Sequence, residues 1–318
     1  MSEYIINADT HEYRLLVHTG IYEVTERNLS AAIMLDRAKL ALSSINDQYN
    51  IHIAYYDDAF RDATIYNQQI TADLDAALAE EQIRPYLQPI TNADNQVVGA
   101  EALVRWIHPE KGFMPPIKFI PVFERNGMIV KIDCYIWRKA CEILSKWDND
   151  MFISINISPR DFYYIEVVSH IKRLVKEFKI DPKRLRIEIV ESVMISDSEE
   201  RMRDLERLRK AGFIVEMDDF GSGYSSLNLL KNMPVDVLKI DMMFLSKSDN
   251  NNRAGIIVKN IINLANELDI TTLTEGVETE EQYKFLSDIG CDLFQGYYFD
   301  KPLPVLDFEK KYLGEVKS

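Results

Sequence analysis

Two adjacent aspartates, Asp218 and Asp219, are the clearest sign of chemistry in the sequence. They follow a predicted buried strand, FIVEM, and precede a glycine- and serine-rich turn, so both carboxylates lie where the chain leaves the strand. Carboxylates this close repel each other unless cations or hydrogen-bond donors satisfy them. We interpret the pair as half of a divalent-metal site. A solvated turn that caps the next helix is the alternative for this dipeptide taken alone.

Further polar residues stand at or near the ends of other predicted strands. They are Gln88, Glu101, Arg105, Asn156, Glu188, Glu191, Lys239, Glu275 and Gln295. Each taken alone has a structural explanation, as a solvent-facing strand residue, a turn amide or a surface lysine. Taken together they are not explained this way, because the acidic residues in VGAEALV, RIEIV and TLTEGV are costly to bury without partners.

Five carboxylates would converge on one site if these strands share a sheet: Glu101, Glu188, Asp218, Asp219 and Glu275. Two divalent cations together with Lys239 would neutralise them. Carboxylates and one Asn amide suit Mg²⁺ or Mn²⁺. Two such ions form the usual clamp for in-line phosphoryl displacement, and Arg105 would bind phosphate. The residues therefore predict a metal-dependent phosphodiester hydrolase whose substrate they do not identify.

Short apolar runs that alternate with helical patterns must position these residues. The predicted strands cover about 84–90, 97–106, 151–157, 185–191, 213–218, 236–240, 270–275 and 292–298. The predicted helices cover about 129–148, 160–178, 198–211, 253–268 and 279–289. The turn NADN joins the first two strands as an antiparallel hairpin. Eight strands with intervening helices predict an α/β fold, an eight-stranded β/α (TIM-like) barrel with an irregular antiparallel first strand. A doubly wound open sheet is the alternative, but no glycine-rich dinucleotide motif follows a strand.

The first 82 residues form a smaller part. A strand pair, or one strand interrupted at Gly20, is predicted over 12–24, a helix over 28–47, a short strand in NIHIAYY and a polar helix over 60–82. These elements are too few for a full core. We expect a small α+β appendage ahead of the barrel.

Composition limits the partners. The net charge of −14 argues against non-specific binding of DNA or RNA. No apolar run is long enough to cross a bilayer and no signal peptide is evident, so we expect a cytoplasmic protein without membrane contact, or the cytoplasmic part of a longer one. The three cysteines are expected to be reduced.

The motifs resemble those of the EAL-domain family of cyclic di-GMP phosphodiesterases. In order they are YLQPI, EALVRW, FIPVFERNG, INISP, EIVES, DDFGSGYSSL, VLKID, EGVET and QGYYFDKPLP, which span about 82–314. The resemblance implies hydrolysis of cyclic di-GMP to linear pGpG, two Mg²⁺ or Mn²⁺ ions per active site, and a homodimer formed through the barrel. A catalytically silent cyclic di-GMP receptor is the alternative, since members of the family also serve as binding modules.

The resemblance also implies roles for individual residues. Glu101, Asn156, Glu188 and Asp218 match ligands of the first metal, and Asp218, Asp219 and Glu275 match ligands of the second. Lys239 matches a lysine that orients or activates the attacking water. Gln88, Arg105 and Gln295 match positions near the substrate, and Glu191 matches the anchor of the loop that carries Asp219.

Residues 12–60 resemble the tail of a diguanylate cyclase (GGDEF) domain, although the signature turn is absent. No cyclase activity is expected. We therefore divide the chain into a partial GGDEF-like remnant (1–60), a helical linker (61–81) and an EAL phosphodiesterase barrel (82–314).

Overall fold

A computed structural model describes residues 3–8, 11–26, 28–45, 51–194, 198–218, 220, 233–241 and 251–314. The chain divides into two compact units, residues 1–75 and 76–318. The second unit contains all of the strands that were expected to carry functional residues. No helix among the described residues combines the length and apolar character that a membrane span requires.

The second unit is a closed barrel of eight strands. Its strands are β5 (Ile83–Asn92), β6 (Val97–His108), β8 (Phe152–Ile157), β9 (Leu185–Val190), β10 (Val215–Asp218), β11 (Val237–Asp241), β12 (Thr271–Glu275) and β13 (Leu293–Gln295). Strand β5 runs antiparallel to both of its neighbours in the barrel, β6 and β13, while the other seven barrel strands are parallel to one another around the ring. The predicted barrel with an antiparallel first strand is confirmed.

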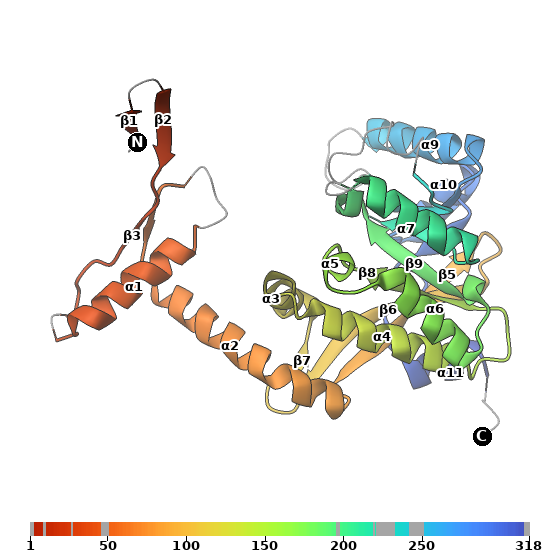
Figure 1. The fold of residues 1–318 in the computed structure, drawn as a ribbon. Coiled ribbons are helices and arrows are strands. Elements are labelled where there is room, and N and C mark those ends of the chain that lie inside the picture. Colours follow the sequence, from red (N-terminus) through yellow and green to blue (C-terminus); the bar gives the residue numbers. More distant parts are fainter. Residues whose placement is uncertain are drawn as a thin grey trace. The chain divides into compact units, whose positions relative to one another are not determined.

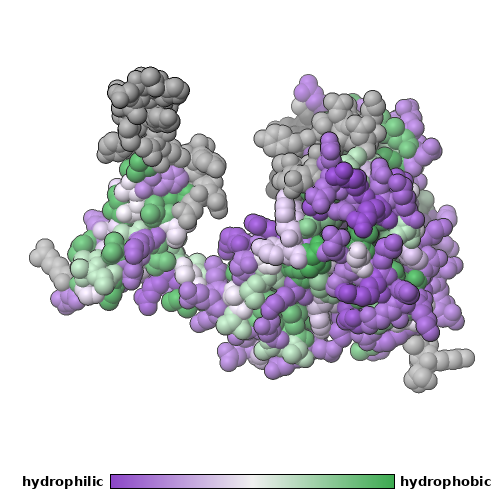
Figure 2. Space-filling model, in the orientation of Figure 1, coloured by the Kyte–Doolittle hydropathy of each residue, from purple (hydrophilic) through white to green (hydrophobic). Residues whose placement is uncertain are grey.

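Helices cover the outside of the barrel (Figure 1). They are α3 (Ile120–Asn126), α4 (Ile129–Leu144), α5 (Asp161–Tyr164), α6 (Val167–Phe178), α7 (Ser198–Lys210), α9 (Asn251–Glu267), α10 (Glu280–Asp288) and α11 (Val305–Tyr312). Each of the longer helices buries one apolar face; α4, for example, buries Ile132, Ile136 and Ala140 against the sheet. The outward faces of α6 and α7 are hydrophilic (Figure 2).

Several elements differ from those expected. The predicted helix over 160–178 is two helices, because the backbone is extended at Ile165 between α5 and α6. Three short elements were not predicted: β7 (Gly112–Met114), β14 (Leu303–Pro304) and α3. Single turns of 3₁₀ helix, which have no long apolar period, also escaped prediction; they are Pro116–Lys118, Pro182–Arg184 and Glu191–Met194. The helix α11 was missed as well.

The first unit contains two small sheets. Strands β1 (Glu3–Ala8) and β2 (His11–Leu16) form an antiparallel hairpin, which begins earlier than the strand predicted over 12–24. Strand β3 (Thr19–Ile21) pairs in parallel with β4 (Ile53–Tyr55), and α1 (Ala31–Ser43) packs on this pair. A Cβ on Gly20 would lie 2.1 Å from the Ala38 carbonyl oxygen, so glycine is required for this close packing.

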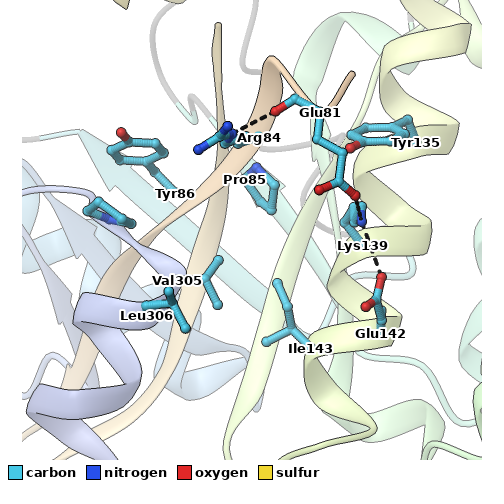
Figure 3. A pocket seen from close by; sticks show the side chains of 11 residues that line it. Glu81, Arg84, Pro85, Tyr86, Tyr135, Lys139, Glu142, Ile143, Val305 and Leu306 are labelled. Atoms are coloured by element: carbon cyan, nitrogen blue, oxygen red, sulfur yellow. Dashed lines mark hydrogen bonds and ion pairs between the residues drawn. The ribbon is translucent and has the colours of Figure 1, made fainter. Parts of the chain in front are cut away.

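The helix α2 (Asp58–Ala79) leads to β5. It ends at Ala79; two residues later Glu81 has a positive φ of 55°, and the Gln82 N–H donates to the Ala77 carbonyl as in a Schellman motif. Lys139 of α4 then binds Glu81 at 2.6 Å and Glu142 at 3.3 Å (Figure 3). These contacts fix the entry to β5 at one side of a shallow pocket that Ile143 and Leu306 also line.

Candidate active site

Lys239 lies at the centre of the barrel mouth and is 1% exposed. Its Nζ forms ion pairs with Glu188 and Glu275, and it lies 3.4 Å from Asp218 Oδ1 and 3.7 Å from Glu101 Oε2. The five residues come from five different strands, β6, β9, β10, β11 and β12. A closed sheet of parallel strands presents all of its C-terminal ends at one rim, which is why residues distant in sequence meet there.

One ammonium group does not balance this many carboxylates. Burial opposes the charge of Lys239, yet the four neighbouring carboxylates raise the pKa of its amine well above the usual value. Burial, reinforced by Glu101, raises the pKa of Glu188 well above its usual value. Burial also raises the pKa of Glu275 to about 8, while Lys239 opposes this increase. Without additional cations, some of these carboxylates therefore hold protons at neutral pH.

Glu216 shows the contrasting pattern of a structural carboxylate. It lies inside the same barrel with 0% exposure, and its two oxygens accept hydrogen bonds from Arg186 at 2.9 Å and from Ser154 at 2.7 Å. Each of its oxygens has its own donor. Glu188 instead shares Lys239 with other carboxylates, and its Oε2 is buried without a hydrogen-bond partner among the described residues. The mouth is thus under-supplied with positive charge, whereas the deeper layer is balanced.

Glu101 is held by two amides. Asn156 Nδ2 donates to its Oε1 at 3.1 Å, and Gln295 Nε2 donates to its Oε2 at 2.7 Å. Gln295 Nε2 also lies 3.2 Å from Gln88 Oε1, and Gln88 is the register partner of Glu101 on the neighbouring strand. Gln88 and Gln295 were expected near the substrate; both are buried beside Glu101, and both also line the cavity described below.

The cluster fits a divalent cation. Carboxylate oxygens of Glu101, Glu188 and Glu275 lie within 4.8 Å of one another. All are hard oxygen donors, and the unpartnered Oε2 of Glu188 is available as a ligand. Asn156 and Asp218 lie beside the cluster, through their contacts with Glu101 and Lys239.

A cavity of about 380 Å³ opens beside these carboxylates. Its lining includes Glu101, Glu275 and Gln295, together with two residues that the sequence analysis did not single out, Glu278 and Tyr297. Both follow a singled-out residue closely, Glu278 in the EGVE motif and Tyr297 two positions after Gln295. Tyr297 is 58% exposed, and the Lys301 Nζ lies 5.3 Å from its ring centroid.

Arg105 is half-buried near the same mouth, and its Nη1 donates to the Val104 carbonyl at 2.8 Å. Burial lowers the pKa of its guanidinium, which remains a permanent cation; Tyr297, Glu101 and Tyr86 oppose the shift. Its expected role in binding phosphate stays a prediction.

Two expected site residues have a different status. Asp219 lies outside the described residues. Glu191 begins the 3₁₀ turn Glu191–Met194 directly after β9, but the Asp219 loop that it was expected to anchor also lies outside them.

Gly296, between Gln295 and Tyr297, leads to a stability prediction. A Cβ there would lie 2.1 Å from the Val277 carbonyl oxygen and 2.3 Å from its nitrogen, both backbone atoms. Gly296→Ala is therefore expected to lower the free energy of unfolding by about 1–3 kcal/mol in urea titrations. In the helical control Gly255→Ala, the new Cβ meets only the Phe285 ring, at 3.3 Å, so a change within about 1 kcal/mol is expected. Equal effects of the two variants would contradict this account.

Comparison with known proteins identifies relatives. A model of the EAL domain matches residues 71–302. The bifunctional diguanylate cyclase/cyclic di-GMP phosphodiesterase MucR of Pseudomonas aeruginosa is 31% identical over 299 residues, which are 92% of this chain and 44% of that protein. The cyclic di-GMP phosphodiesterase NbdA of the same organism is 34% identical over 247 residues, 76% of this chain and 32% of that protein. The chain thus spans less than half the length of these relatives.

Solved structures agree with this relationship. The PaMucR phosphodiesterase in a c-di-GMP complex is 33% identical with a TM-score of 0.71, and the match covers 76% of this chain and 99% of that one. The EAL enzyme Bd1971 in its cAMP- and cyclic-di-GMP-bound form is 27% identical with a TM-score of 0.75, over 90% of this chain and 77% of that one.

Proposed function

The chain belongs to the EAL-domain family, and on that premise we propose that it is a metal-dependent phosphodiesterase that hydrolyses cyclic di-GMP to linear pGpG. The observation that carries the proposal is the meeting of four carboxylates around the single buried amine of Lys239. Burying four carboxylates around one amine costs stability, and a structural site would not need it. The buried structural carboxylate Glu216, by contrast, has a separate hydrogen-bond donor for each oxygen.

Two sets of residues would hold divalent ions. Glu101, Asn156, Glu188 and Asp218 would hold one Mg²⁺ or Mn²⁺, and Asp218, Asp219 and Glu275 a second. When bound, such ions supply an acidified water molecule and stabilise the oxygen that leaves phosphorus. Gln295 and Asn156 fix the orientation of Glu101 through its two oxygens.

Lys239 would act as a hydrogen-bond donor to the attacking water molecule. Its neighbouring carboxylates keep its amine protonated, so it orients a water molecule by donating a hydrogen bond and does not take a proton from it. Arg105 at the rim would bind a phosphate of the dinucleotide. The exposed ring of Tyr297 beside the cavity would stack on a guanine base.

Hydrolysis of cyclic di-GMP by the purified chain tests the proposal directly. The nucleotide is incubated with Mg²⁺, with Mn²⁺ and with EDTA, and linear product is followed by chromatography. We expect pGpG with either metal and none in EDTA, because the unbalanced carboxylates would lose the ions that they hold. A silent receptor would instead bind the nucleotide in EDTA and leave it intact in every condition.

The remaining expectations are part of the same proposal. Residues 1–60 would be a partial GGDEF-like segment; the relative MucR, which matches 92% of this chain, is described as a bifunctional diguanylate cyclase/cyclic di-GMP phosphodiesterase. Residues 61–81 would be the linker and 82–314 the phosphodiesterase. The barrel would form a homodimer, which the mass of the purified chain in solution would test.

A further inference from the structure

Strand β8 ends at Ile157, and the segment in which the chain leaves it, here called the Asn156–Ser158 turn, is held from outside the barrel by α4 and α5. Trp137 of α4 is fully buried, and its indole Nε1 donates to the Asn156 carbonyl at 2.9 Å. Two residues later in the turn, the Ser158 N–H donates to Asp161 Oδ2 at 2.8 Å. Asp161 is 0% exposed and begins α5. The backbone is thus bonded on both sides of Ile157.

Asp161 in turn contacts Asp133, which lies one helical turn before Trp137 on α4. The Oδ1 of Asp161 is buried and meets no hydrogen-bond donor elsewhere in the described part of the chain. Two ionised carboxylates would repel each other at this contact, so one of them must carry a proton. The Ser158 N–H stabilises the ionised form of Asp161 through its Oδ2, which favours Asp133 as the group that carries the proton.

The titration behaviour agrees with this assignment. Burial, together with Asp161, raises the pKa of Asp133 well above its usual value. Burial raises the pKa of Asp161 to about 7, while the Ser158 N–H and Asp133 hold it lower than burial alone would. The two carboxyls therefore keep their protons to a higher pH than isolated aspartates do.

We propose that Trp137 and the hydrogen-bonded Asp133–Asp161 pair are positioning residues that hold the Asn156–Ser158 turn in its metal-binding geometry. The side chain of Asn156 in this turn connects it to the carboxylate cluster, because its Nδ2 donates to Glu101 Oε1 at 3.1 Å. A turn released from α4 would move both the Asn156 amide and the Glu101 carboxylate that it orients. This inference rests on the proposed function, in which both residues bind metal.

Other charged groups near the pair do not replace its proton. Glu124 of α3 reinforces the raised pKa of Asp133. Cys134 of α4 has a pKa raised by burial to about 11, so it stays a neutral thiol. Arg173 of α6 acts on Cys134, and Arg105 of β6 lines the cavity of about 240 Å³ that Asp133 also lines. Neither cation forms an ion pair with Asp133 among the described contacts.

Binding of Mn²⁺ alone, measured by electron paramagnetic resonance or calorimetry, tests the positioning role apart from catalysis. Trp137→Phe keeps an aromatic ring and removes the indole N–H. We expect its dissociation constant for Mn²⁺ to be about 10- to 100-fold larger than that of the wild type. Trp147→Phe is the matched control, because Trp147 is also buried but donates its indole N–H to Glu309. We expect it to leave Mn²⁺ affinity unchanged.

Two variants of Asp133 test the shared proton. Asp133→Leu removes the donor and is expected to weaken Mn²⁺ binding as Trp137→Phe does. Asp133→Asn supplies a permanent N–H donor and should bind Mn²⁺ as the wild type does near neutral pH. The wild-type hydrogen bond between Asp133 and Asp161 exists only while Asp133 keeps its proton. The support that this bond gives to metal binding is therefore lost as the pH rises through the raised pKa of Asp133. The ratio of the Asp133→Asn affinity to the wild-type affinity, measured with Mg²⁺, should therefore increase toward alkaline pH.

The outcomes separate the two proposals. If the wild type binds Mn²⁺ and Trp137→Phe binds it equally well, the positioning role is overturned while the proposed function stands. A ratio for Asp133→Asn that stays constant with pH overturns the shared proton. If the wild type binds no Mn²⁺ at all, the proposed function fails, and the positioning role fails with it.

Discussion

Lys239→Met is expected to destabilise the metal-free protein by about 3–5 kcal/mol, because it removes the cation from a buried cluster of carboxylates. The size of the effect should depend on pH. Glu188 and Glu275 already have raised pKa values, about 8 for Glu275, and the loss of Lys239 raises both further. A raised pKa in the folded protein means that stability is greatest below the unfolded value of 4.5 and is lost as the pH rises. The loss should therefore be larger at about pH 8.5 than at about pH 5.

Urea unfolding in EDTA and in Mn²⁺ would measure this effect, with added metal restoring part of the stability of the variant. Lys139→Met is the matched control, since Lys139 also pairs with two carboxylates but is 25% exposed. Its replacement should cost only about 0.2–1 kcal/mol. In turnover assays Lys239→Met should lose about 10²–10³-fold in kcat, as when a preorganised donor is removed, with a smaller change in KM. A variant with normal stability and kcat would remove the role assigned to Lys239.

Glu101→Ala is expected to lower metal-dependent turnover of cyclic di-GMP by about a thousandfold or more, beyond the 10- to 100-fold typical of residues that only support a ligand. Glu101 contributes an oxygen to the carboxylate cluster and also receives the Asn156 and Gln295 amides, so its loss disorganises the other groups as well. Turnover should not recover at saturating substrate, because the missing group acts on the reaction more than on nucleotide binding.

Glu142→Gln controls for the loss of a negative charge. Glu142 pairs with Lys139 and Lys146 on the outer surface of α4, so turnover should stay within about twofold of the wild type, as for an exposed ion pair. Circular dichroism would confirm that Glu101→Ala is folded. A folded Glu101→Ala protein with wild-type turnover would refute the assignment of this residue.

The arrangement of the mouth could be predicted because barrel geometry links it to sequence. Once Glu188, Lys239 and Glu275 are assigned to the ends of parallel strands, the closed sheet brings them together without further information. The alternation of side chains along β6 likewise predicts that Glu101 faces inward. Their roles as metal ligands or donors stay predictions.

Other features depend on tertiary contacts that no local pattern reveals. The contact between Asp133 and Asp161 joins two helices, and Asp133 stands within an otherwise ordinary amphipathic pattern over 129–148. The hydrogen bonds that Gln295 donates to Gln88 and Glu101 join strand β13 to β5 and β6, which are far from it in sequence. The break at Ile165 was missed because the apolar pattern continues across it from α5 to α6.

The reversed direction of β5 also determines where the polypeptide enters the barrel. Ile83, its first residue, pairs with Trp106, which lies on β6 beyond Glu101 toward the C-terminal end of that strand. Had β5 run parallel to its neighbours, the incoming chain would have reached the floor of the barrel, opposite the carboxylates. Instead the entrance and the reactive groups share one end, and the strand that enters there carries Gln88 to the side of Glu101. Protein engineers who fuse a domain ahead of this barrel would be attaching it at the rim that carries the carboxylates, so the length and stiffness of the junction at Glu81 would affect access to that rim as well as tethering.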